Sequence, residues 1–176
     1  MIRIAITGPE SSGKTTLAKQ LASHLEGCLV EEYAREYLMN TKKTGSYSLD
    51  DLVEIAGKQY LMNLGRDCKS GYLVCDTELT VIKIWALDKF GYCPGEIISL
   101  YERQQFDLIF LCKPDFPWQP DPLREDPERR KYLFGLYVEE LFLEDEDFFV
   151  LSGSPEERLK AAIEQIKAHK TGLKEG

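Results

Sequence analysis

A glycine-rich loop lies close to the beginning of this chain and limits the folds that the chain can adopt. Residues 8–15 read Gly-Pro-Glu-Ser-Ser-Gly-Lys-Thr and fit the pattern G-x-x-x-x-G-K-[ST]. The apolar run Ile2–Ile6 precedes the loop, and Leu17, Leu21 and Leu25 follow it at the spacing of one helical face. A strand, this loop and then a helix are the context that the motif requires, so the sequence predicts a phosphate-binding P-loop.

The chemistry of such a loop assigns roles to its residues. Gly8 and Gly13 permit the tight turn, so that backbone N–H groups and the positive end of the helix dipole converge on phosphate. Lys14 is expected to reach the β- and γ-phosphates, Thr15 to hold Mg²⁺, and Thr16 to contact the α-phosphate. The motif predicts binding of ATP, with GTP left open, together with Mg²⁺. The expected nucleotide-binding residues are Gly8, Glu10, Ser11, Ser12, Gly13, Lys14, Thr15 and Thr16.

Further apolar runs and amphipathic patterns alternate along the chain. The expected strands are Ile2–Ile6, Leu29–Val30, Tyr72–Cys75, Leu108–Cys112 and Phe148–Leu151. Helical spacing follows the P-loop and recurs in residues 48–68, 82–86, 133–141 and 159–166, with Ser48 and Asp51 forming a capping box. This alternation predicts a three-layer α/β P-loop NTPase fold: a mostly parallel five-stranded sheet with helices on both faces. The length of 176 residues fits one domain, 1–176.

Composition argues against several classes of function. A formal net charge of -8 disfavours nucleic acid as a partner, and no apolar run is long enough to span a membrane or serve as a signal peptide. The five cysteines are widely spaced and form no C-x-x-C pair, so the sequence indicates neither a disulfide framework nor a zinc site. We therefore expect a cytoplasmic protein. The oligomeric state is left open.

Asp76 closes the run Tyr72–Cys75. A carboxylate at the end of a buried strand beside a P-loop can hold Mg²⁺, or accept the proton of an attacking hydroxyl. The competing interpretation is that Asp76 caps the following helix. Similarly, Glu32 and Arg35 follow the second expected strand, where open α/β sheets bind ligands. They could equally form an exposed ion pair.

Residues 113–130 contain five prolines and are expected to form a lid loop. Arginines on a closing loop stabilise charge during phosphoryl transfer, so Arg124 is the first candidate and Arg129 and Arg130 follow, although mixed charges here also suit a solvated surface. Trp118 in this loop can stack on a planar ring or simply pack against the body. Trp85, beside Ile82 and Ala86, is interpreted as core.

Several of these pieces together resemble the ribosylnicotinamide kinase domain of NadR-type NAD-salvage proteins. The matching strings are residues 8–17, Glu-Tyr-Ala-Arg-Glu-Tyr at 32–37, Cys-Asp-Thr at 75–77, and Pro-Trp at 117–118 followed by Asp121 and Arg124. They span most of the chain in the family's order. The P-loop is widely shared, whereas the other strings are more specific.

The resemblance implies transfer of the ATP γ-phosphate to the 5′-hydroxyl of nicotinamide riboside, giving nicotinamide mononucleotide. It implies that Trp118 stacks on the nicotinamide ring, that Asp76 is the acceptor-side carboxylate and that Arg124 belongs to the lid. The expected catalytic residues are Lys14, Asp76 and Arg124, and the expected substrate-binding residues are Glu32, Tyr33, Arg35, Asp76, Trp118 and Asp121.

Two departures from the family pattern are visible. The chain begins at the first kinase strand, so we expect neither the adenylyltransferase activity nor the gene repression of larger members. Pro122-Leu123 replaces Gly-Leu between the loop Asp and Arg. A kinase for another nucleoside is one rival interpretation. A nucleotide-dependent switch or ATPase that acts on a protein partner is the second.

Overall fold

The sheet of this protein contains the five expected strands. The computed structural model describes residues 1–41, 46–65, 67–118, 128–144 and 147–175. The strands are β1 (Ile2–Thr7), β2 (Cys28–Val30), β3 (Tyr72–Asp76), β4 (Leu108–Cys112) and β5 (Phe148–Leu151). They lie in the order β2-β3-β1-β4-β5, and every pairing is parallel. Parallel strands covered on both faces need apolar side chains throughout, which is why short continuous apolar runs located them.

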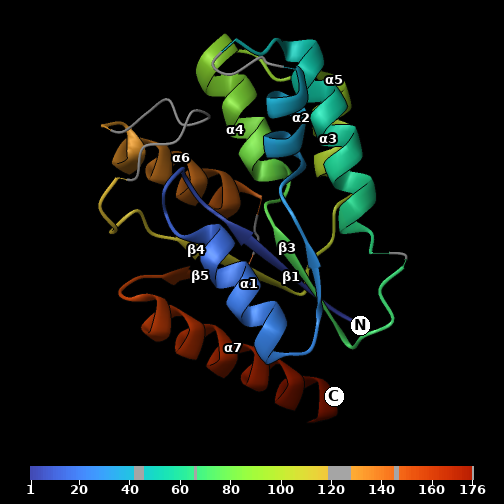
Figure 1. Cartoon of the computed structure of the whole chain (residues 1–176), viewed down its shortest axis with the longest axis vertical. Coiled ribbons are helices and arrows are strands. Elements are labelled where there is room, and N and C mark those ends of the chain that lie inside the picture. Colours follow the sequence, from blue (N-terminus) through green and yellow to red (C-terminus); the bar gives the residue numbers. More distant parts are fainter. Residues whose placement is uncertain (42–45, 66, 119–127, 145–146, 176) are drawn as a thin grey trace.

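Helices cover both faces of the sheet (Figure 1). On one face α1 (Lys14–His24) and α7 (Pro155–Glu175) pack against Ile4, Ile6 and Phe110. On the other, α4 (Leu79–Phe90) and α6 (Arg130–Leu143) pack against Ala5, Ile109 and Leu111. These are the three layers of a P-loop NTPase fold, as the sequence predicts.

A further group of helices gathers beside α4, beyond the carboxyl ends of β2 and β3 (Figure 1). It consists of α2 (Tyr33–Thr41), α3 (Leu49–Asn63) and α5 (Gly95–Tyr101), which share an apolar cluster with α4. The capping box at the start of α3 is confirmed: the Ser48 hydroxyl accepts from the Asp51 N–H, and Asp51 accepts from the Ser48 N–H. Neither α2 nor α5 was expected from the sequence, because helices of nine and seven residues carry too few turns to show a clear period.

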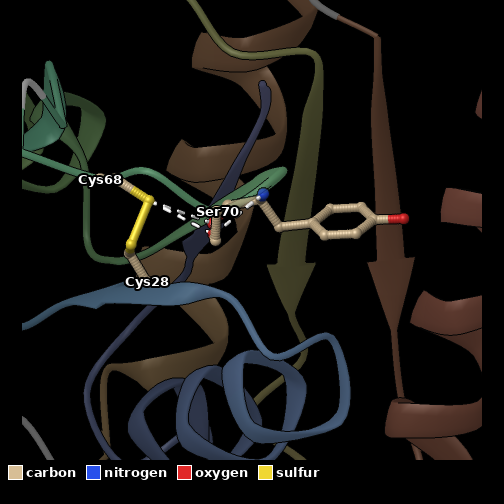
Figure 2. Close-up of a disulfide and its surroundings, with 4 residues drawn as sticks. Cys28, Cys68 and Ser70 are labelled. Carbon is tan, nitrogen blue, oxygen red and sulfur yellow. Dashed lines mark hydrogen bonds between the residues drawn. A yellow bond between two sulfur atoms is a disulfide. The ribbon is translucent and has the colours of Figure 1, made fainter.

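One expectation about the cysteines is wrong. Cys28 at the start of β2 forms a disulfide with Cys68 in the connection before β3, 40 residues away (Figure 2). Parallel pairing places Cys28 opposite Leu73, next to that connection. Ser70, beside Cys68 in Figure 2, donates a hydrogen bond to the Tyr72 carbonyl and helps to hold the segment. Because disulfides are rare in reducing compartments, the cysteines no longer support the cytoplasmic expectation.

The lid expected at 113–130 is described only at its two ends, 113–118 and 128–130. Asp121 and Arg124 lie outside the described residues, so the structure does not place these two predicted side chains. Across the part of the chain that is described, none of the helices combines the length and apolar character needed to cross a membrane.

Candidate active site

The P-loop joins β1 to α1 and depends on two glycines. Gly8 has φ 132°, and a Cβ atom there would lie 2.7 Å from the Cys112 carbonyl oxygen. Gly13 has φ 86° and caps α1, and a Cβ atom there would lie 2.8 Å from the Phe116 ring. Both positions therefore exclude a side chain for conformational and steric reasons. The loop consequently presents the free N–H groups of a helix start to an anion.

Two cations are already attached to this loop. The Lys14 ammonium donates to the carbonyl oxygens of Gly8, at 2.8 Å, and Pro9, at 2.9 Å. The Arg130 guanidinium donates to the carbonyls of Ser11, at 3.3 Å, and Phe116, at 2.9 Å. Lys14 and the predicted lid residue Arg130 thus bring positive charge to the expected position of the phosphates.

Asp76 lies at the end of β3 and is 2% exposed. Burial raises the pKa of its carboxyl, while a hydrogen bond with the Thr15 side chain and the charge of Lys14 lower it. Within the described part of the chain, Asp76 Oδ1 has no hydrogen-bond partner. A buried carboxylate oxygen beside a threonine hydroxyl fits Mg²⁺, which prefers oxygen ligands and is completed by phosphates and water. The alternative that Asp76 caps the next helix is wrong, because Glu78 caps α4 and accepts from the Thr80 N–H.

The residue after Asp76 has an unusual backbone. Thr77 is 1% exposed and has φ 93°, a conformation that a β-branched residue rarely adopts. Its N–H donates to the Ile6 carbonyl and its carbonyl accepts from Asn63. Strain of this kind costs about 1–3 kcal/mol and persists where the surroundings enforce it. The end of β3 is therefore held in a fixed orientation, which fixes Asp76 as well.

Asn63 belongs to a buried pair of amides that connects two strand ends. The Gln59 amide donates to Asn63 Oδ1 at 2.9 Å, and its oxygen accepts from the Tyr33 N–H at 2.8 Å. Asn63 in turn reaches the Thr77 carbonyl at 3.3 Å. Gln59 and Asn63 are 1% and 6% exposed. This chain of hydrogen bonds couples the segment after β2, which carries Glu32, to the segment that carries Asp76.

A cavity of about 230 Å³ opens above the P-loop. Beyond the loop itself, its walls come from α1, α2, α4 and α6, from the residue just before α2, from the start of the lid and from the start of α7. These wall residues are Leu17, Gln20, Glu32, Arg35, Leu38, Val81, Trp85, Phe116, Pro117, Tyr137, Pro155 and Arg158. Glu32 and Arg35 therefore share one cavity with the nucleotide-binding loop, as the sequence predicts.

Other predicted residues lie elsewhere. Tyr33 packs its ring against Tyr37, with centroids 6.1 Å apart, and is not among the described residues that line the cavity. Trp118 is absent from the same lining, and its ring lies 5.6 Å from the Arg130 guanidinium. Arg129 makes a two-pronged ion pair with Asp88 on α4, at 3.0 and 2.6 Å. Arg130, by contrast, donates a hydrogen bond directly to the P-loop, at the Ser11 carbonyl.

Arg158 lies in the site but was not among the predicted site residues. This guanidinium is 1% exposed and donates to the carbonyls of Ser12 at 2.5 Å, Lys113 at 2.8 Å and Gly153 at 3.0 Å. It also pairs with the Asp115 carboxylate and lies 4.3 Å from the Phe116 ring centre. Its only sequence signal is a basic residue in the first turn of a helix, where basic residues are unfavourable.

Comparison with known proteins agrees with this geometry. A family model described as an AAA domain matches residues 3–158. The trifunctional NAD biosynthesis/regulator proteins NadR of Salmonella typhimurium and Escherichia coli are each 28% identical over 144 residues, covering 78% of this chain. The chain spans only 35% of the length of these curated relatives. The predicted similarity to NadR-type proteins is confirmed.

Solved structures show the same fold. A NadR protein in complex with NR superimposes with a TM-score of 0.72 at 23% identity, over 87% of this chain and 44% of that one. A deoxyadenosine kinase from M. mycoides, with dCMP and dCDP bound, superimposes with a TM-score of 0.66 at 15% identity, over 95% of this chain and all of that one. The predicted P-loop fold is thus shared with kinases.

Proposed function

This chain belongs to the AAA domain family whose model spans residues 3–158, and from that premise we propose that it is an ATP-dependent nucleoside kinase. The favoured acceptor is nicotinamide riboside, phosphorylated at its 5′-hydroxyl to give nicotinamide mononucleotide. Similarity to NadR proteins supports this choice of acceptor. Residues 1–176 would act as a single kinase domain.

One observation carries the proposal: the phosphate loop and a polar wall suited to an acceptor border the same cavity. Glu32, just before α2, and Arg35, in its first turn, line it together with Lys14 and Thr15. A carboxylate can accept hydrogen bonds from sugar hydroxyls, and a guanidinium can donate to carbonyl or hydroxyl oxygens. Two substrates held in one cavity can react without diffusing apart, which is the main contribution of a kinase to phosphoryl transfer.

The residues of the loop divide the work on ATP. The N–H groups of Gly8 and of residues 10–15 would bind the phosphates, and Lys14 would exchange its loop carbonyls for β- and γ-phosphate oxygens. Thr15 and Asp76 would hold Mg²⁺, which neutralises charge that develops on the phosphates. If Asp76 does not hold Mg²⁺, its carboxylate would instead accept the proton of the attacking hydroxyl. Arg130 would stabilise the transferred group.

The direct test is a product assay. The purified protein is incubated with Mg-ATP and a panel of nucleosides that includes nicotinamide riboside and deoxyadenosine, and phosphorylated products are identified by mass. We expect selective formation of nicotinamide mononucleotide, and loss of turnover in Lys14→Ala. A different phosphorylated nucleoside would keep the kinase and replace the acceptor. ATP hydrolysis without any phosphorylated acceptor would refute the kinase proposal in favour of a nucleotide-dependent switch.

A further inference from the structure

The wall of the cavity opposite the P-loop has a composition of its own. It is built from three helices, with Leu38 from α2, Val81 and Trp85 from α4, and Tyr137 from α6. Glu32 and Arg35 add polar groups at its edge. Ligand cavities typically combine an apolar, aromatic wall with a few polar groups that set orientation. This half of the cavity therefore has the character of a binding site for a partly apolar molecule.

A second cavity adjoins the first on the other side of this wall. This second cavity, of about 150 Å³, is lined by Pro9, Glu10, Tyr47, Ile84, Trp85, Asp88, Lys89, Arg129, Leu133 and Tyr137. It shares Glu10, Trp85 and Tyr137 with the first cavity. Trp85 therefore stands where the two meet.

Trp85 is held in place by residues that line the second cavity. It follows Val81 by four residues, so both side chains project from one face of α4. Its indole stacks on the Tyr47 ring, with centroids 5.8 Å apart and planes inclined by 28°. The Lys89 ammonium lies 3.7 Å from the centre of that tyrosine ring. The flanking residues Ile84 and Ala86 are buried, whereas Trp85 is only half-buried. A half-buried indole that is fixed by a neighbouring ring is a rigid aromatic surface.

We propose that Trp85, supported by Tyr47, is the surface on which the planar heteroaromatic ring of the phosphoryl acceptor stacks. The proposal rests on the kinase function above and assigns the acceptor ring to α4 rather than to Trp118. Every heteroaromatic ring has a π-face, so stacking on Trp85 favours heteroaromatic acceptors in general and does not distinguish one such ring from another. Glu32 and Arg35 then distinguish one ring or sugar from another through their hydrogen bonds. The required substrate class is a hydroxylated sugar that carries a flat heterocycle.

Fluorescence provides the first test, because the chain has only two tryptophans. In Trp118→Phe, Trp85 is the sole indole, and the protein is titrated with nicotinamide riboside and with deoxyadenosine in the presence of a non-hydrolysable ATP analogue. We expect a saturable quench of Trp85 emission by whichever of the two the protein phosphorylates. An unchanged emission during binding that calorimetry detects would overturn the proposal.

Kinetics provides the second test. Removing an aromatic partner of a base typically weakens binding by about 5- to 150-fold. We expect Trp85→Leu to raise the KM for the acceptor within that range while the KM for ATP stays unchanged, and Trp85→Phe to recover part of the loss. The unchanged KM for ATP distinguishes this effect from a damaged fold, which would affect both substrates. If Trp85→Leu does not fold, Trp85→Phe and the fluorescence titration still decide.

The matched control is Phe142→Leu, which removes an aromatic ring that is 77% exposed on α6 and lines neither cavity among the described residues. It should leave both KM values unchanged. A normal acceptor KM in Trp85→Leu, with turnover intact, would overturn the role of Trp85 alone. Failure of the unaltered protein to phosphorylate any acceptor would instead refute the kinase function, and this proposal with it.

Discussion

Arg158 offers the strongest test of how the site is held together. Its guanidinium donates to three backbone carbonyls, of Ser12, Lys113 and Gly153, and pairs with Asp115. These acceptors belong to the P-loop, the segment after β4 and the segment after β5. We predict that Arg158→Met, which keeps most of the side-chain volume and removes the donors, destabilises the protein and loosens the P-loop.

The magnitude follows from burial. A hydrogen bond from a charged group contributes about 1.5–3 kcal/mol, and removing one partner of a buried charged network costs about 3–5 kcal/mol. The Asp115 side chain is 29% exposed and can regain water, so its share is at the low end. Because the desolvation cost of the guanidinium disappears as well, we expect a net loss of about 3–5 kcal/mol. For a chain of this size each kcal/mol lowers the Tm by about 2–4 °C, so the Tm should fall by about 6–20 °C.

The assay is urea unfolding, with and without saturating Mg-ATP. Arg158→Lys should recover little, since one ammonium cannot reproduce the planar fork of donors. Asp115→Asn is the matched control, because it weakens the ion pair and leaves the three carbonyl contacts in place; we expect a smaller loss of stability than in Arg158→Met. The stabilisation by Mg-ATP should be smaller in Arg158→Met than in Asp115→Asn. If Arg158→Met loses no more stability than Asp115→Asn, the reasoning from the carbonyl contacts is wrong.

Three further predictions follow from other parts of the structure. Asp76→Asn should lower turnover by about 10²- to 10⁴-fold. Burial raises the pKa of this carboxyl above its value in the unfolded chain, so the ionised carboxylate destabilises the folded state at neutral pH, and this cost disappears as the pH falls through the raised pKa. Asp76→Asn should therefore have a Tm at pH 7 equal to or above that of the parent. A lower Tm would contradict this reasoning. Gln59→Leu leaves the Tyr33 N–H and Asn63 Oδ1 without their hydrogen-bond partner, so it should lower the unfolding free energy by about 2–4 kcal/mol and raise the KM for the acceptor more than the KM for ATP. The control Lys58→Leu, on the exposed side of α3, should do neither. Equal effects of Gln59→Leu on the two KM values would count against the coupling. Reduction with dithiothreitol should lower the unfolding free energy by about 2–4 kcal/mol. Cys68→Ser should lower it by the same amount and should no longer respond to the reductant. If the unfolding free energy of the parent protein does not change with dithiothreitol, Cys28 and Cys68 are not joined in solution.

The strands could be predicted because burial in a parallel sheet requires a short continuous run of apolar residues, which is visible in the sequence. Leu108–Cys112 and Phe148–Leu151 match the observed bounds, because both runs are apolar at every position and Leu108–Cys112 is buried throughout. The P-loop was equally visible, because its two glycines are required by local backbone geometry that neighbouring residues reveal. Features encoded within about ten residues of chain were therefore within reach of the sequence.

Features that join distant segments were not. Arg158 and Ser12 are in contact although they are 146 residues apart in the sequence, and no local sequence pattern predicts that contact. Trp85 was interpreted as core because Ile82 and Ala86 are core, yet the face of α4 that it shares with Val81 borders the cavity. The Cys28–Cys68 disulfide depends on β2 lying next to β3. In each case the missing information is which elements lie side by side.

The order of the strands explains why the site nevertheless gathers residues that the sequence could identify singly. In an all-parallel sheet every strand ends at the same edge, so residues that directly follow strands converge there. Gly8 follows β1, Glu32 follows β2 and Asp76 closes β3, while the segments after β4 and β5 supply the carbonyls that Arg158 binds. Arg158 therefore connects three of the five strand ends. The Gln59 and Asn63 amides connect the other two. A substitution of Arg158 should consequently affect mainly the phosphate loop, and a substitution of Gln59 or Asn63 should affect mainly the acceptor wall.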